Sequence, residues 1–154
     1  MTEQYSLEFS LQAGNDKGPI IATTAAEVDA AIDRLAAADP LLQTPTVFVR
    51  ERPRFGPAKL PDHGLKIALD SARAVGALAY YGPGDELEDE GPWVTLGALS
   101  TADGAELYQD LDSGSEFPAD AAVPLDLVRS AIHAFRMNGG QRPDVLAWRT
   151  SETW

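Results

Sequence analysis

The chain has 154 residues, 44% of them hydrophobic and including 3 Trp, 4 Tyr and 5 Phe, which suits one domain with a core and argues against disorder. Its formal net charge of −12, from 24 acids and 12 bases, disfavours nucleic acid as a partner because phosphates would be repelled. The absence of cysteine excludes a disulfide, a thiol nucleophile and a thiolate metal site.

The negative charge is concentrated in one segment. No lysine or arginine stands between Arg73 and Arg129, and residues 74–128 carry 12 of the 24 acids. The rest of the chain holds 12 acids and 12 bases, so its charges cancel. A region of one sign produces a directional field, and we expect it to attract a basic surface on another macromolecule.

Targeting features are missing from the sequence as given. Residues 1–5 include an acid where a signal peptide has bases, and no apolar core follows. The longest run of small and apolar residues, 74–81, is far shorter than the roughly 20 residues that cross a bilayer. These features predict a cytoplasmic protein that does not associate with membranes.

Alternation of apolar and polar residues predicts strands over residues 5–12 and 64–70, and other short segments along the chain also read as strands. In the first half, the predicted strands are residues 5–12, 19–22, 46–50 and 64–70. One helix is predicted among them, over residues 24–38, because Thr24 and Glu27 have the spacing of a capping box and Pro40 ends the pattern. The proline-rich segment 51–61 is predicted to be a loop.

The second half adds strands, an acidic loop over residues 82–92 and another helix. Its predicted strands are residues 77–81, 93–96, 107–111, 115–117 and 145–149. The helix is predicted over residues 124–138, with Pro124 at its first position and a left-handed cap at residues 138–140. The sum is a single α+β domain over residues 1–154, with a mostly antiparallel sheet of about six to eight strands and two main helices.

No motif for catalysis or cofactor binding emerges. His63 and His133 lack an Asp or Ser at triad spacing, so we expect a surface histidine and a helix-flank histidine respectively. Residues 110–116 are similar to a calcium loop, but the glycine comes one position early and no helices flank it. A hairpin turn is favoured there over weak divalent binding. We therefore expect no catalytic residue, no metal and no cofactor.

The acids of segment 74–128 are instead candidates for recognition, the alternative being an ordinary solvated face. One group lies in the acidic loop, and the other lies along a predicted strand whose alternate residues include a tyrosine and share one face. The candidates are Asp85, Glu86, Glu88, Asp89 and Glu90 in the loop, and Glu106, Tyr108, Asp110 and Asp112 along the strand.

The C-terminal third carries a motif of several parts. A proline leads a helix with an alanine and an aromatic residue on its inner face, and a glycine, an Arg-Pro pair and a tryptophan-bearing strand follow. The pattern resembles the end of the first-described immunity-protein family of bacterial polymorphic toxin systems, and the upstream order of elements also fits. The extra glycine before Arg142 departs from it. Packing of the helix on the sheet, a positive φ at the glycine and burial of the indole predict that the motif residues belong to the scaffold. They are Pro124, Ala131, Phe135, Gly139, Pro143 and Trp148.

The resemblance implies an immunity protein, not an enzyme. Its partner would be a cognate toxin domain of nucleic-acid deaminase or nuclease type, whose basic active-site cleft it occludes. Two other classes stay open from the residues alone: a small hydrolase or transferase that uses carboxylates, and an adaptor domain of a secretion system. Two converging carboxylates in a pocket would favour the enzyme, and a large modular toxin gene upstream would favour immunity.

Overall fold

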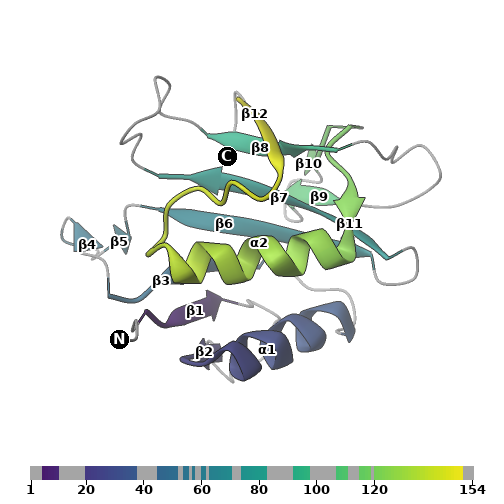
Figure 1. Cartoon of the computed structure of the whole chain (residues 1–154). Coiled ribbons are helices and arrows are strands. Elements are labelled where there is room, and N and C mark those ends of the chain that lie inside the picture. Colours follow the sequence, from purple (N-terminus) through teal and green to yellow (C-terminus); the bar gives the residue numbers. More distant parts are fainter. Residues whose placement is uncertain are drawn as a thin grey trace.

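Two helices lie on one face of an eight-stranded antiparallel sheet (Figure 1). The computed structural model describes residues 5–10, 20–37, 45–51, 54–55, 57, 60–61, 63–70, 74–82, 92–97, 107–110, 115–118 and 120–150. Helix α1 spans Ala25–Ala37 and helix α2 spans Leu125–Met137, each within one residue of the predicted ends. The predicted α+β class and the predicted range of strand number are confirmed.

The main sheet has the strand order β12-β8-β7-β6-β3-β1-β2, and β11 also pairs with β7. Its strands are β1 (Leu7–Ser10), β2 (Ile20–Ala22), β3 (Thr46–Val49), β6 (Gly64–Asp70), β7 (Val75–Tyr81), β8 (Trp93–Leu96), β11 (Val123–Pro124) and β12 (Ala147–Thr150). The longest pairing joins β6 and β7, from Gly64 opposite Tyr81 to Asp70 opposite Val75. This hairpin forms the centre of the sheet.

Two shorter hairpins are separate from the main sheet. Strand β4 (Arg54–Phe55) pairs with β5 (Leu60–Pro61), so the prediction of an uninterrupted loop over residues 51–61 is wrong. A proline is tolerated there because a two-residue edge strand does not need its missing N–H. Strand β9 (Tyr108–Asp110) pairs with β10 (Ser115–Glu116), as the turn predicted between them requires.

The main sheet has an apolar cluster on each face. On the helix face, Leu65, Ile67, Leu78 and Tyr80 of the central hairpin pack beneath both helices. The helices contribute Val28, Ala31, Ile32, Leu35, Val128, Ala131, Ile132 and Phe135. Full burial of each valine, leucine, isoleucine or phenylalanine contributes about 1.5–3 kcal/mol, so this larger cluster is the main core.

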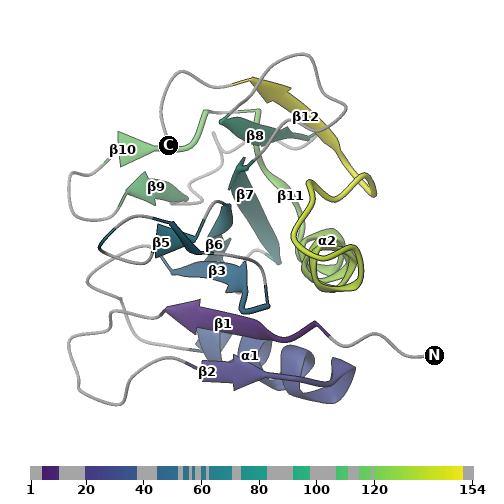
Figure 2. The same cartoon turned by 90° about the vertical axis from the view of Figure 1, so that its left-hand side faces the viewer.

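The opposite face of the sheet carries a smaller cluster. Leu107 and Phe117, which flank the β9–β10 hairpin, pack with Ala77, Ala79 and Val94. The Phe117 N–H donates to the Leu107 carbonyl at 2.8 Å and closes this layer. Figure 2 shows the β9–β10 hairpin and α2 on opposite sides of β6 and β7. The small alanines of β7 therefore let a third layer approach the sheet closely.

The start of α1 is a capping box, as predicted. The Thr24 hydroxyl accepts from the Glu27 N–H at 3.1 Å. The Glu27 carboxylate reaches one residue farther than predicted, accepting from the Thr23 N–H at 2.7 Å and from the Thr23 hydroxyl at 2.8 Å. These bonds, the backbone one first, hold the pKa of Glu27 below its ordinary value.

The start of α2 differs from the prediction. Pro124 occupies the N-cap, with φ −59 and ψ 146, rather than the first helical position. Proline has no side-chain acceptor, and the first helical N–H, that of Leu125, donates instead to the Ala74 carbonyl at 2.9 Å. Pro124 belongs to β11, which pairs with β7, so sheet pairing fixes the entry into the helix.

The end of α2 is the predicted left-handed cap. Gly139 and Gly140 have φ of 74 and 96. The Gly139 N–H donates to the Arg136 carbonyl at 3.2 Å, and the Gly140 N–H donates to the Phe135 carbonyl at 2.9 Å. This is the Schellman pattern, which satisfies carbonyls that the helix end would leave without partners.

One edge of β7 is shared by two strands. Strand β11 pairs with its first residues and β8 with Ala79 and Tyr80. At the fork between them, the fully buried Thr95 hydroxyl accepts from the Leu78 N–H at 3.2 Å and donates to the Ala121 carbonyl at 2.8 Å. The Thr95 side chain thus takes the place of backbone hydrogen bonds at the point where β8 and β11 separate along β7.

Replacing Thr95 should test this fork. Thr95→Val keeps the shape but leaves a buried N–H and a buried carbonyl without partners, so we expect a loss of about 2–3 kcal/mol in the free energy of unfolding, measured in urea. Thr95→Ser, which keeps the hydroxyl, should lose about 1 kcal/mol for the missing methyl group. Equal losses in the two variants would contradict a hydrogen-bonding role.

Replacing Ala74 with glycine should stabilise the protein rather than destabilise it. It has a φ of 57, in the left-handed region that costs an alanine roughly 1–2 kcal/mol. Ala74→Gly should therefore stabilise the protein by about 0.5–1 kcal/mol in thermal unfolding, after the added entropy of the unfolded chain is subtracted. Ala30→Gly, the same change within α1, should destabilise it by about 1 kcal/mol. A loss of stability in Ala74→Gly would contradict the strain.

Candidate partner-binding surface

Most of the predicted contact residues lie outside the described residues. These are Asp85, Glu86, Glu88, Asp89, Glu90, Glu106 and Asp112. Tyr108 and Asp110 are described as backbone and form the two ends of β9, where they pair with Glu116 and Ser115 of β10. The contribution of all nine residues to binding stays a prediction.

The described parts of the acid-rich segment, residues 74–128, lie in and around the β7–β8 half of the main sheet (Figures 1 and 2). They comprise β7, β8, β11, the β9–β10 hairpin and the first turn of α2. The hairpin packs on the sheet face that α1 and α2 leave open. The segment thus builds a layer of its own and is anchored in the core through β7.

Two acids of the segment are described with their side chains. Asp126 is exposed in the first turn of α2, where a carboxylate complements the helix dipole. Asp120 Oδ1 lies 2.9 Å from Arg149 Nη2, a close ion pair without the alignment of a hydrogen bond. The acids of this segment are separated from basic residues along the sequence but not completely in the folded protein. Arg149, from the charge-balanced part of the chain, lies beside Asp120.

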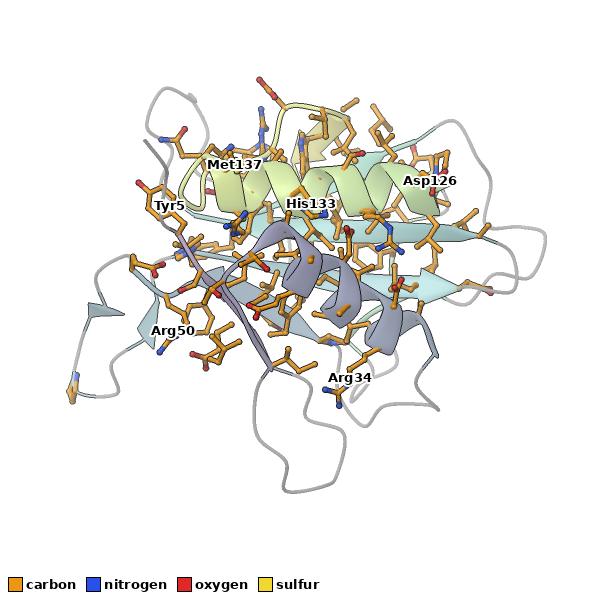
Figure 3. All side chains as sticks on the ribbon, turned by 60° about the horizontal axis from the view of Figure 1, so that its bottom comes forward. Tyr5, Arg34, Arg50, Asp126, His133 and Met137 are labelled. Atoms are coloured by element: carbon orange, nitrogen blue, oxygen red, sulfur yellow. The ribbon has the colours of Figure 1, made fainter. Side chains whose placement is uncertain are left out.

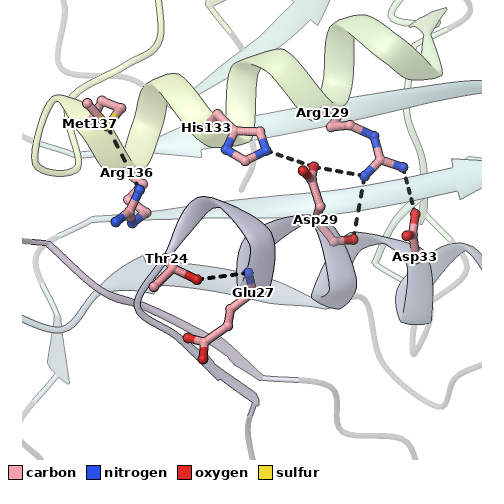
Figure 4. A network of polar contacts seen from close by, with 8 residues as sticks. All are labelled: Thr24, Glu27, Asp29, Asp33, Arg129, His133, Arg136 and Met137. Atoms are coloured by element: carbon pink, nitrogen blue, oxygen red, sulfur yellow. Dashed lines mark hydrogen bonds and ion pairs between the residues drawn. The ribbon is translucent and has the colours of Figure 1, made fainter.

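A polar network joins the two helices (Figures 3 and 4). Asp29 accepts from Arg129 Nη1 at 3.0 Å and lies 2.8 Å from His133 Nε2. Asp33 accepts from Arg129 Nη2 at 2.7 Å. An ionised carboxylate only accepts, so the His133 Nε2–H is the donor to Asp29. His133 thus lies on a helix flank, as expected, and clamps α2 to α1.

The network favours the ionised state of the Asp29 carboxylate. Hydrogen bonds from His133 and then from Arg129 hold the pKa of Asp29 below its ordinary value. Hydrogen bonds to Asp33 and then to Asp29 raise the pKa of Arg129. A carboxylate with a lowered pKa contributes stability above the titration range of a free aspartate, near about pH 4, and loses it in acid. Asp29 and Arg129 therefore both stay charged at neutral pH.

The sequence contained an unused signal for this network. Asp29 and Asp33 are four residues apart on α1, and Arg129 and His133 are four residues apart on α2. Residues at this spacing share one helix face. Two helices with opposite charges at matching spacing are therefore candidates for pairing, although only the fold shows that they are neighbours.

The expectation of a surface position for His63 is wrong. The residue is 4% exposed, and its ring packs between Phe48 and Phe135, with centroids at 6.3 and 5.6 Å. Its Nε2 accepts from the Val49 N–H at 2.9 Å, so this nitrogen carries no proton and the imidazole is neutral. The polar residues on either side of His63 in the sequence suggested an exposed loop, although its ring is buried in the fold.

The motif residues at the C-terminus surround an aromatic cluster. Ala131 and Phe135 are fully buried, Gly139 supplies a positive φ, and Pro124 is exposed at the N-cap. The Tyr80 ring lies 6.3 Å from both Phe135 and Trp148 and 5.9 Å from Trp93, measured between centroids.

Two hydrogen bonds fix the cluster. Trp148 Nε1–H donates to the carbonyl of the buried Pro143 at 2.6 Å, which gives the indole the partner it needs. The Tyr80 hydroxyl donates to the Gly140 carbonyl at 3.0 Å. Strand β7, the end of α2 and the start of β12 are thereby held together.

The described residues offer no assembled catalytic centre. Among them, no group of three His, Asp or Glu side chains is placed to hold a metal ion. His133 is engaged with Asp29, and His63 is buried as a hydrogen-bond acceptor. In this part of the chain, no helix is long and apolar enough to span a membrane.

The comparison with known families agrees with the C-terminal pattern. The family described as Immunity protein Imm1 matches residues 16–150, which include both helices and every strand of the main sheet except β1. No curated protein matches the chain. Membership of this family suggests immunity to a toxin, and proteins of the family are generally not enzymes. Because the match covers most of its 154 residues, the chain belongs to the Imm1 family of immunity proteins.

Proposed function

We propose that the protein binds a cognate domain of a bacterial polymorphic toxin, of nucleic-acid deaminase type, and covers its basic active-site cleft without catalysing a reaction. The family match over residues 16–150 carries the proposal, since the partner of an immunity protein is a toxin. The protein acts in the cytoplasm, where a toxin of this type meets its nucleic-acid substrate.

The charge distribution supports this type of partner. A deaminase or nuclease toxin must present basic residues to the phosphates of its substrate. An inhibitor with a net charge of −12, whose excess of acids falls within residues 74–128, is complementary to such a cleft. Complementary fields raise association rates well above those of neutral surfaces. We place the contact on the side built by this segment, with the acidic loop and the β9 residues taking part.

Capture of the partner tests the function. A tagged copy of the protein, expressed in its native cell, should retain a toxin domain that deaminates nucleic acid when alone and is inactive at a 1:1 ratio with this chain. A captured partner without toxin activity, or a toxin that keeps full activity in the complex, would contradict the proposal.

Charge reversal tests the acidic loop. Changing Glu86, Glu88, Asp89 and Glu90 together to lysine should slow association with the captured toxin roughly 10- to 100-fold at low salt, as measured by stopped flow. The difference from the wild-type protein should shrink at high salt because exposed charges are screened. Unchanged association kinetics at low salt would remove the loop from the interface.

A matched control separates local from net charge. Reversal of Glu3, Asp16, Asp39 and Glu152 changes the net charge by the same amount but lies outside residues 74–128. This variant should associate at a rate much closer to that of the wild-type protein, and both variants should keep the wild-type unfolding temperature within a few degrees. Equal slowing in the two variants would assign the effect to net charge rather than to the segment.

A further inference from the structure

Arg142 lies on two tryptophan rings near the start of β8. Its guanidinium carbon is 5.0 Å from the ring centroid of Trp93 and 5.9 Å from that of Trp148. A cation–π contact holds the guanidinium through its positive charge and uses no hydrogen-bond acceptor. The contact with the two rings therefore leaves the N–H donors of the guanidinium fork for other acceptors.

Within the described part of the chain, no oxygen accepts a hydrogen bond from Arg142 and no carboxylate forms an ion pair with it. The two other arginines described there as partly buried are both engaged. Arg129 binds Asp29 and Asp33, and Arg136 donates to the Tyr5 and Thr23 carbonyls at 3.0 and 2.9 Å. Burial lowers the pKa of Arg142, an effect that Tyr80 opposes. The guanidinium is thus partly desolvated before any partner arrives.

The surroundings of Arg142 are fixed by hydrogen bonds. Trp148 is held through its Nε1–H to the Pro143 carbonyl at 2.6 Å, and the Gln141 N–H donates to Asn138 Oδ1 at 3.0 Å. Trp93 is only 4% exposed and packs against Tyr80 with its ring tilted by 38°. A side chain held in this way loses little conformational entropy on binding, which favours a strong contact.

We propose that Arg142 binds an aspartate or glutamate carboxylate of the partner toxin in a two-pronged hydrogen-bonded pair, and that this contact is a hot spot of the complex. The inference rests on the proposed function. The planar fork of a guanidinium matches a carboxylate, and arginine and tryptophan are enriched where a few residues carry most of the binding energy.

Charge selects a protein carboxylate over a phosphate chain. The field of a protein with net charge −12 repels a polyanion. A single acid on an otherwise basic toxin surface arrives with compensating positive charge around it. At Arg142 a basic residue of this protein then meets an acidic residue of the toxin, the reverse of the charge pairing at the acidic segment. This reversal fixes the orientation of the toxin. The acidic segment governs association, and Arg142 governs dissociation.

The test compares three variants against the toxin domain captured with the wild-type protein. Arg142→Gln should weaken binding roughly 100-fold, mainly through faster dissociation. Arg142→Lys keeps the charge but lacks the fork, so its affinity should fall about tenfold. Arg34→Gln removes the same charge from an exposed position on α1 (Figure 3) and should change the dissociation constant less than about twofold.

A purely structural role for Arg142 predicts a different pattern. Thermal unfolding and tryptophan fluorescence of the free variants report any loss of packing. If Arg142→Gln does not fold, Arg142→Lys carries the test. A folded variant with lower stability but wild-type affinity would overturn the inference and leave the proposed function standing. Failure of the wild-type protein to bind any toxin would overturn both.

A charge swap identifies the occupant. Arg142→Glu should abolish detectable binding, and changing one aspartate or glutamate of the toxin to arginine should restore it at least tenfold. Rescue by arginine at one of this chain's own acids would place the carboxylate within the protein and overturn the inference. Absence of rescue in a scan of all toxin acids would do the same.

Discussion

Strand β7 is the constraint on which the rest of the structure depends. It pairs with β6 along its whole length and shares its other edge between β8 and β11. Its alternating side chains serve both faces, with Leu78 and Tyr80 beneath the helices and Ala77 and Ala79 beneath the β9–β10 layer. The acid-rich segment begins at residue 74, directly before this strand.

Much of the fold was predictable because its signals are local. Period-two alternation predicted β1 and β6, Thr24 and Glu27 predicted the start of α1, and the glycines after α2 predicted its left-handed end. The fork at Thr95 was not predictable, since it depends on which two strands share an edge of β7. The buried position of His63 was missed for a similar reason, because a polar loop sequence does not reveal that Phe135 lies across it.

The candidate site was less predictable than the fold. Sequence showed where the negative charge is concentrated but not which acids have partners, and Arg149 reaches Asp120 from a distant part of the chain. The sequence showed Arg142 only as part of the C-terminal motif. Its contact with two indole rings was not predictable, because these rings come from β8 and β12, which are far apart in sequence. In the proposed account, a charged surface brings a basic toxin close and a fixed arginine sets its orientation.

The central claim is that both the acid-rich segment, residues 74–128, and the turn that carries Arg142 meet the toxin. Hydrogen–deuterium exchange of the protein, free and in complex with its captured toxin, tests this most directly. The account predicts protection in peptides from residues 74–128 and 138–148, with exchange in α1 and β1–β3 unchanged. Protection confined to α1 and β1–β3 would contradict it.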